Sequence, residues 1–231
     1  MGTTPEPTQQ LGGHSNTARF LDRRDAGRRL ATLLVQFARA HPLVLGVSRG
    51  GVPVAYEVAR ALGGASLAAL AVCKVGAPGK PEHVIGAVVE GGLRVINTDD
   101  VRRLRISSEE IEAAFMLRHE HVVSRGGQHE AFRLPIEVAG RAVIVVDDGV
   151  ETGVTARAAL RAVRQGYPRR LVLGVPVGVR EAVDRLRREA NQVVCLQRPE
   201  LSGPVGSWYE HFEPVEDAQV AALVTGGGNG A

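Results

Sequence analysis

One segment constrains the fold of this chain more than any other: residues 143–156, where an apolar run leads into two acids and a small-residue loop. The run is four β-branched residues, Val143–Val146, and Asp147 and Asp148 follow it directly. A continuous apolar run of this kind predicts a strand buried on both faces, as in a parallel sheet. Ligands of open α/β sheets bind outside the carboxyl ends of the strands, so we expect the acids to lie at a binding site.

The loop that follows the acids has the composition of a phosphate site. It contains Gly149, Thr152, Gly153 and Thr155 and leads into a run of helix-forming residues that starts at Ala156. Backbone amides at the N-terminus of a helix favour a phosphate dianion, and the Thr hydroxyls add donors. Ionised carboxylates only accept hydrogen bonds, so the acids suit a vicinal diol. A phosphate site beside a diol site predicts the binding of ribose 5-phosphate.

A plainer interpretation of the same segment is a buried strand that runs into an ordinary capped helix. Adjacent carboxylates repel each other and are costly to desolvate without partners, however. Stability alone therefore gives little reason to place Asp147 beside Asp148, and we favour the binding site.

The segment resembles the phosphoribosyl-pyrophosphate motif of the type I phosphoribosyltransferases, which consists of four apolar residues, two acids and a Thr-Gly-x-Thr loop. Here that loop is Thr152-Gly153-Val154-Thr155. The resemblance covers most of the chain, from about Arg19 to Val224. Within the family, the chain is similar to a stand-alone bacterial branch that is described only as "predicted phosphoribosyltransferase". The other segments that carry it are residues 20–27, 43–55, 73–82 and 205–209.

The resemblance implies an α/β fold: a three-layer sandwich with a mainly parallel central sheet and a small hood from the terminal segments. Alternating strands and helices in the second half of the chain also favour a parallel sheet. We expect a disordered tail at 1–16, one domain at 17–224 and a flexible glycine-rich tail at 225–231. The apolar patterns predict strands at 43–47, 67–75, 84–89, 93–96, 142–146, 171–175 and 193–196, and helices at 26–40, 54–62, 108–124, 155–165 and 179–190.

The resemblance also implies a reaction, the transfer of a phosphoribosyl group from 5-phosphoribosyl-1-pyrophosphate to an acceptor with release of pyrophosphate. Asp147 and Asp148 would bind the ribose hydroxyls near the cationic transition state. Mg²⁺ would arrive on the pyrophosphate with few protein ligands, so we expect no direct metal ligand, and at most a contact through water to Asp147 or Asp148. The ribose 5-phosphate loop would comprise Gly149, Glu151, Thr152, Gly153, Val154 and Thr155.

Two positions of this loop depart from the family pattern. Gly149 stands where a bulky apolar residue is common, which would loosen the loop. Glu151 puts a carboxylate at the edge of a phosphate site, and we expect it to point outward.

The resemblance places pyrophosphate on Ser48, Arg49, Gly50 and Gly51, where glycines let the backbone come close and Arg49 supplies a forked cation. An ordinary strand-to-helix turn would also contain Gly-Gly. The Ser48–Arg49 peptide is a candidate for the cis form that the family often has at this point.

Residues 74–82 resemble the entrance to the mobile loop of the family. Lys74 would act in catalysis, and Lys80 would bind pyrophosphate, although a solvated basic turn explains Lys80 as well. The Gly and Pro residues between them should prevent a regular strand ladder, so the segment could close over the ligand and exclude water. Glu82 could position a Mg²⁺-bound water or the acceptor, and His83 is a candidate general base.

The sequence says least about the acceptor of the phosphoribosyl group. Trp208 and Tyr209 could stack on a flat acceptor, or they could equally anchor a C-terminal flap. A base, another amine or a hydroxyl all remain open as acceptors.

Composition bounds the remaining functions. The formal net charge is +3, and we find no dense Lys/Arg cluster or helix-turn-helix segment, so we do not expect nucleic-acid binding. No apolar run reaches membrane-spanning length, and Cys73 and Cys195 suit reduced core positions in a cytoplasmic protein. The sequence does not determine the oligomeric state, and a homodimer is one possibility. The alternatives to a transferase are a regulator of the same fold that senses phosphoribosyl-pyrophosphate or nucleotides, and a hydrolase of such compounds.

Overall fold

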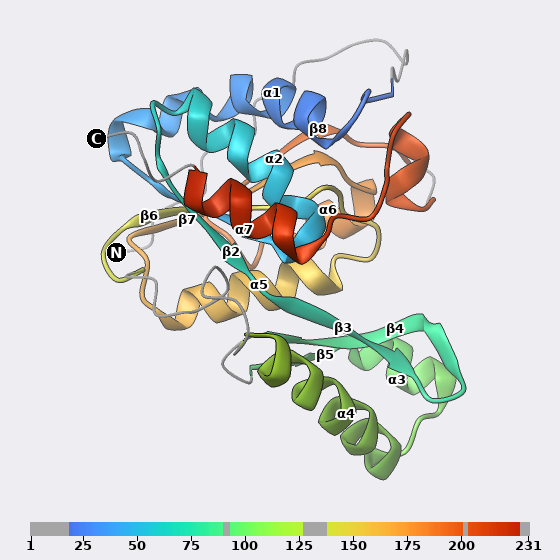
Figure 1. The fold of residues 1–231 in the computed structure, drawn as a ribbon. Coiled ribbons are helices and arrows are strands. Elements are labelled where there is room, and N and C mark those ends of the chain that lie inside the picture. The colour runs from blue at the N-terminus through green and yellow to red at the C-terminus, as the bar shows by residue number, and fades with distance from the viewer. Residues whose placement is uncertain (1–18, 90–92, 127–137, 201–202, 227–231) are drawn as a thin grey trace.

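A computed structural model of the chain describes residues 19–89, 93–126, 138–200 and 203–226. At its centre is a sheet of five parallel strands in the order β2-β1-β6-β7-β8 (Figure 1). The strands are β1 (Leu43–Val47), β2 (Ser66–Leu70), β6 (Ala142–Val146), β7 (Arg170–Val177) and β8 (Gln192–Gln197). Four of them match strands expected from the apolar runs, apart from their ends, and β2 is the first part of the strand expected at 67–75.

Helices cover both faces of this sheet, because alternate residues of each buried strand point to opposite sides. Val44 and Ile144 pack with Leu30 on one face, whereas Val145 packs with Leu160 on the other. The expected three-layer sandwich is therefore confirmed. The helices of the first face are α1 (Arg23–Leu34) and α2 (Ser48–Ala61), and those of the second are α5 (Val154–Gln165) and α6 (Arg180–Leu186).

A smaller unit extends from one edge of the sandwich (Figure 1). It contains an antiparallel sheet of three strands in the order β3-β4-β5, covered by two helices around the buried Phe115. Its elements are β3 (Val72–Ala77), β4 (Lys80–Val89), β5 (Arg94–Ile96), α3 (Thr98–Leu104) and α4 (Ser108–Gly126).

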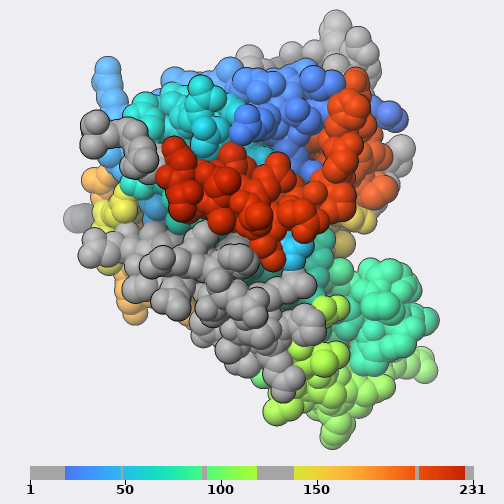
Figure 2. All heavy atoms as spheres, viewed as in Figure 1, coloured from blue at the N-terminus to red at the C-terminus, as the bar shows by residue number. Residues whose placement is uncertain are grey.

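The two terminal segments meet on the larger unit, as the expected hood requires. Phe20 forms a parallel bridge with Tyr209, and its backbone N–H donates to the carbonyl of Trp208 at 2.9 Å. The C-terminal segment crosses the main body (orange to red in Figure 2). The remaining helices are η1 (Val35–Ala40), η3 (Val205–Trp208) and α7 (Asp217–Gly226), of which α7 packs on α2 and β2. The expected tail at 1–16 lies outside the described residues, and the expected tail at 225–231 begins within α7.

The expected strand at 67–75 is wrong as a single element. The structure divides it into β2 and β3, which belong to different sheets. The apolar run continues through Ala71, so nothing local marks the point where the chain leaves one sheet for the other.

Three helix expectations also needed correction. α2 begins at Ser48 rather than after Pro53, because proline is tolerated near the start of a helix. The helix expected at 26–40 becomes 3-10 after Leu34, and the one expected at 179–190 ends at Leu186. α3 was not expected at all.

The expected irregular loop at 74–82 is likewise wrong, because the segment belongs to the β3–β4 hairpin. Lys74 pairs with Ala87, and the ladder then shifts register on either side of Gly76. A Cβ at Gly76 would overlap the carbonyl oxygen of Pro81, and Gly79 turns the chain with φ +68°. The bulge and the turn accommodate the Gly and Pro residues that seemed to exclude a ladder.

Candidate active site

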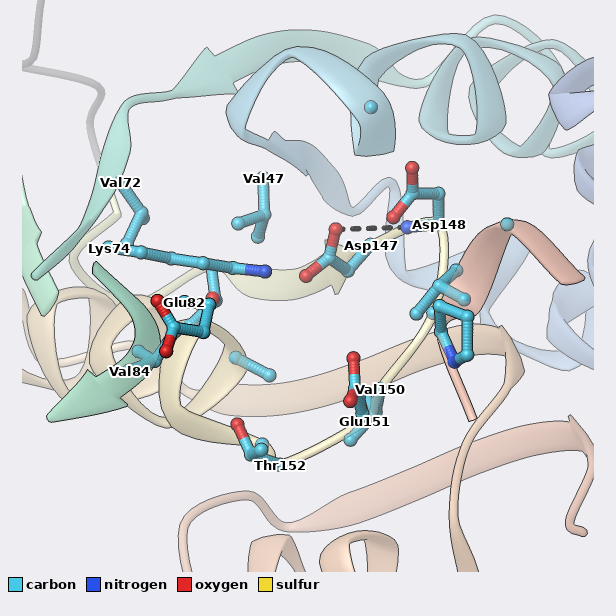
Figure 3. A pocket seen from close by; sticks show the side chains of 18 of the residues that line it. Val47, Val72, Lys74, Glu82, Val84, Asp147, Asp148, Val150, Glu151 and Thr152 are labelled. Atoms are coloured by element: carbon cyan, nitrogen blue, oxygen red, sulfur yellow. Dashed lines mark hydrogen bonds between the residues drawn. The ribbon is translucent and has the colours of Figure 1, made fainter. Parts of the chain in front are cut away.

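A cavity of about 730 Å³ lies at the carboxyl ends of β1 and β6, beside the β3–β4 hairpin (Figure 3). It brings together residues expected from three parts of the sequence. The expected residues that line it are Gly50, Lys74, Asp147, Asp148, Gly149, Glu151, Thr152, Gly153 and Thr155.

Asp147 is the buried member of the acidic pair, with 8% of its surface exposed. Its Oδ1 accepts the backbone N–H of Asp148 at 2.9 Å, and Lys74 extends toward it from β3 (Figure 3). Burial raises the pKa of Asp147 well above its ordinary value, and the neighbouring Asp148 raises it further, while Lys74 opposes the shift. A cation or a set of hydroxyl donors that enters the cavity would relieve this cost.

Asp148 has different partners. Its Oδ2 accepts from the Arg23 guanidinium at 2.9 Å, in an ion pair whose side chains are 12% and 16% exposed. The Tyr209 hydroxyl donates to the backbone carbonyl of Asp148 at 2.5 Å. Both terminal segments thus hold the acidic loop from one side.

Two helices direct their N-termini toward the cavity. The residue before α5 is Gly153, with φ +81°, and the residue before α2 is Val47; neither of these two residues caps its helix through a side chain. At α5, Thr152 Oγ1 accepts from the backbone N–H of Val154 at 3.5 Å. The first backbone N–H groups of a helix have no partner within the helix, so both N-termini can bind anions. By contrast, Asp22 caps α1 in the ordinary way, accepting from the N–H of Asp25.

Glycines allow α2 to lie against the acidic loop. A Cβ at Gly50 would overlap Asp148 Oδ2, and one at Gly51 would lie 2.6 Å from the carbonyl oxygen of Val146. Gly50 and Gly51 therefore bring α2 close to the protein's own acidic pair, whereas the approach expected from the sequence was toward pyrophosphate.

Comparison with known proteins identifies the family. Residues 18–211 match the family model described as "Phosphoribosyl transferase domain". The chain belongs to the phosphoribosyl transferase family.

Relatives and solved structures agree with this assignment. A Mycobacterium tuberculosis protein named as a putative phosphoribosyl transferase is 40% identical over 205 residues, which are 89% of this chain and 46% of that protein. This chain therefore spans about half the length of the curated relatives it matches first. The bifunctional protein PyrR of Thermus aquaticus is 47% identical over 58 residues, 25% of this chain and 29% of that protein. The crystal structure of TT1426 from Thermus thermophilus shares 42% identity and has a TM-score of 0.73, covering 89% of this chain and 97% of that one.

The structure does not bring every expected residue to the cavity. Arg49 does not line the cavity, because its Nε pairs with Asp217 of α7 at 2.8 Å. Lys80 is exposed on β4 and does not line the cavity, and Val154 is buried in the core. The side chain of Ser48 lies outside the described part of the structure, and the described residues contain no cis peptide bond, so the expected cis Ser48–Arg49 peptide is not found.

The aromatic pair takes the second of its two expected roles. Tyr209 is 4% exposed and packs against Phe20 and Phe212, with ring centroids 5.4 Å and 4.9 Å apart. Trp208 does not line the cavity. Tyr209 is therefore an anchor of the C-terminal segment and cannot stack on an acceptor.

The two departures from the family pattern also have structural outcomes. A Cβ at Gly149 would lie 2.5 Å from Val205, so Val205 fills the space that a bulky residue would need. Glu151 is exposed but lines the cavity, so the expectation that it points outward is wrong.

Several residues of the site were missed or undervalued from the sequence. Arg23 had only the resemblance of residues 20–27 to mark it, without a role. Glu82 and His83 line the cavity and form a side-chain hydrogen bond, with Glu82 Oε1 3.0 Å from His83 Nδ1. The others come from α3 and the C-terminal segment, where only the resemblance at 205–209 marks two of them and gives them no role: Asp100, Arg103, Pro204, Val205, Gly206 and Phe212.

In the described residues, no group of three or more His, Cys, Asp or Glu side chains is arranged to hold a metal ion. Among the described helices, none is long and apolar enough to cross a membrane.

Proposed function

We propose that the protein transfers a phosphoribosyl group from 5-phosphoribosyl-1-pyrophosphate to an acceptor, with release of pyrophosphate and in the presence of Mg²⁺. One observation carries this proposal: a carboxylate pair lies between two helix N-termini in a single cavity. Such a site matches a ligand with a diol between two phosphate groups.

The geometry suggests how the donor lies. Its 5-phosphate would bind the N-terminus of α5, where Thr152 and Thr155 add hydroxyls. Asp147 and Asp148 would accept from the ribose hydroxyls. The pyrophosphate would lie near the start of α2, with Lys74 as its cation, because Lys74 and Gly50 line the same cavity.

The acidic pair would then act on the transition state. As the bond from C1 to pyrophosphate breaks, positive charge develops on the ribose, and a carboxylate that binds the hydroxyls lies close to it. A hydrogen bond to a charged group contributes about 1.5–3 kcal/mol. The energy accelerates the reaction to the extent that the contact strengthens in the transition state. The β3–β4 hairpin, which supplies Lys74 and Glu82, would limit the access of water.

The residues present fit a Mg²⁺ ion that arrives on the donor. The described residues offer no cage of three ligands, yet carboxylate oxygens of Asp147 and Glu82 line the cavity, and Mg²⁺ prefers oxygen. A backbone hydrogen bond at Glu82, followed by His83 and Lys80, keeps the pKa of Glu82 below its ordinary value, so its carboxylate is available to a cation. When bound, the ion would neutralise charge on the leaving pyrophosphate.

The acceptor would approach the wall formed by Pro204, Val205, Gly206 and Phe212, which we call the C-terminal wall. The residues of this wall do not select among a base, another amine and a hydroxyl as the acceptor. A decisive experiment incubates the protein with Mg²⁺, phosphoribosyl-pyrophosphate and a metabolite panel, and follows the products by mass spectrometry. Failure to release pyrophosphate with any acceptor, together with failure to bind the donor, would contradict the proposal.

Donor binding is expected to raise the melting temperature. A ligand at one hundred times its Kd stabilises the native state by about 2.7 kcal/mol, which for a protein of this size corresponds to roughly 5–11 °C. Thr155→Val should diminish the shift, because it removes a hydroxyl that lines the cavity. Differential scanning fluorimetry with Mg²⁺ and millimolar phosphoribosyl-pyrophosphate tests this, and an unchanged melting curve would argue against the whole assignment.

Arg49 and Lys74 are expected to differ in their effect on pyrophosphate binding. Lys74→Ala should weaken it about tenfold or more, because a charged contact in the cavity is lost. Arg49→Gln should change it by less than about threefold and lower stability by at most about 1 kcal/mol, since its partly exposed ion pair is with Asp217. Calorimetric titration of Mg²⁺-pyrophosphate compares the two variants. Equal losses would mean that Arg49 leaves Asp217 and reaches the ligand.

A further inference from the structure

Arg23 is the first residue of α1, and three groups hold its guanidinium. Nε donates to Asp148 Oδ2 at 2.9 Å, and Nη1 donates to the backbone carbonyl of Glu213 at 2.8 Å. The guanidinium carbon lies 3.7 Å from the centroid of the Phe212 ring. A side chain fixed in this way has little freedom left to lose when a ligand binds.

Asp148 is confined by the same surroundings. A Cβ at Gly50 would overlap its Oδ2, so α2 closes one side of the carboxylate. Tyr209 holds its backbone carbonyl at 2.5 Å. Arg23 uses Oδ2, and no described residue donates to Oδ1, which leaves that oxygen for a ligand.

The two acids thus have separate cations. Lys74 extends toward Asp147 from the β3–β4 hairpin (Figure 3). Arg23 pairs with Asp148 from α1. Adjacent carboxylates repel each other, and an unpaired carboxylate with little exposed surface is costly. Because Arg23 is only 12% exposed, solvent screens its pair with Asp148 less than it screens a surface pair.

We propose that Arg23 is a positioning residue that acts through Asp148, holding this carboxylate in the orientation that binds the ribose hydroxyls. The inference rests on the proposed function. Arg23 also contacts Phe212, so it joins the ribose site to the C-terminal wall.

The test is a double-mutant cycle on ribose 5-phosphate binding, measured by calorimetry for wild type, Arg23→Gln, Asp148→Asn and the double variant. Arg23→Gln should weaken binding about tenfold, as expected for one charge-assisted hydrogen bond. In the Asp148→Asn background, Arg23→Gln should weaken ribose 5-phosphate binding by less than about a further twofold, because the carboxylate through which Arg23 acts is gone. Arg23→Lys should recover part of the affinity, since it keeps the charge without the fork.

Two controls separate positioning from a general structural role. Inorganic phosphate should bind wild type and Arg23→Gln equally, because it does not engage Asp148. Arg24→Gln, one residue along α1, removes an ion pair with Glu57 at 3.7 Å and should leave ribose 5-phosphate binding unchanged. If Arg23→Gln does not fold, the same double-mutant cycle is measured with Arg23→Lys in its place.

The possible outcomes are distinct. An effect of Arg23→Gln that persists in full in the Asp148→Asn background, or that weakens inorganic phosphate equally, would overturn the inference and leave the proposed function standing. If wild type binds neither ribose 5-phosphate nor phosphoribosyl-pyrophosphate, the proposed function and the inference both fail.

Discussion

The Asp147→Asn/Asp148→Asn variant is expected to lose phosphoribosyl transfer by roughly 10²- to 10⁴-fold. Each carboxylate is proposed to make a charge-assisted hydrogen bond worth about 1.5–3 kcal/mol, and each 1.36 kcal/mol of transition-state stabilisation is a factor of ten. An amide accepts hydrogen bonds but carries no charge to stabilise a ribosyl cation. Pyrophosphate release with the acceptor found in the metabolite panel measures the loss.

The control for this variant is its stability. Because burial raises the pKa of Asp147 in the folded protein, the contribution of this group to stability is greatest below its ordinary pKa of about 4 and is lost as pH rises through the raised value. At pH 7 an amide in place of Asp147 removes this penalty, so Asp147→Asn alone should melt no lower than wild type. Near-wild-type transfer by a folded double variant would show that other residues carry the chemistry.

Gly51→Ala is expected to reduce both stability and donor binding. Its Cβ would lie 2.6 Å from the Val146 carbonyl oxygen and 3.0 Å from Asp147 Cα, which are backbone atoms that cannot move aside alone. Overpacking of this kind costs about 1–3 kcal/mol, or roughly 2–12 °C in melting temperature. Moving α2 away from the acidic pair should also weaken phosphoribosyl-pyrophosphate binding by about tenfold or more, a loss of about 1.4 kcal/mol.

Gly203→Ala is the matched control. The nearest atom to its Cβ is Ser207 Oγ at 3.7 Å, an ordinary contact, so its stability should stay within about 0.5 kcal/mol of wild type. Thermal melts and donor titration of both variants make the comparison. If Gly51→Ala melts and binds like Gly203→Ala, α2 does not depend on close contact with the acidic loop.

The C-terminal wall is built by a segment that is distant in sequence from the acidic loop. Val205 occupies the space beside Gly149, and the Tyr209 hydroxyl donates to the backbone carbonyl of Asp148. We propose that this wall forms one side of the acceptor site. Variants of Val205 or Phe212 should change the choice of acceptor more than the binding of the donor.

The sequence by itself determined the parallel sheet and the centre of the site. The central segment is contiguous in the sequence: Val143–Val146, Asp147, Asp148 and the loop that follows. Its order along the chain is therefore enough to predict a strand, then the two acids, then a loop and a helix N-terminus. The strand at 43–47 was predictable for the same reason.

Tertiary structure decided what depends on distant segments. The run at 67–75 splits between two sheets because pairing with β1 ends at Leu70, while β4 pairs with the next residues. Arg49 and Arg23 both lie near the start of a helix, yet Arg49 pairs with Asp217 and Arg23 pairs with Asp148. Which carboxylate each arginine reaches depends on where α7 and the acidic loop pack. A charged side chain takes the nearest opposite charge in space, and spacing along the chain does not record that distance.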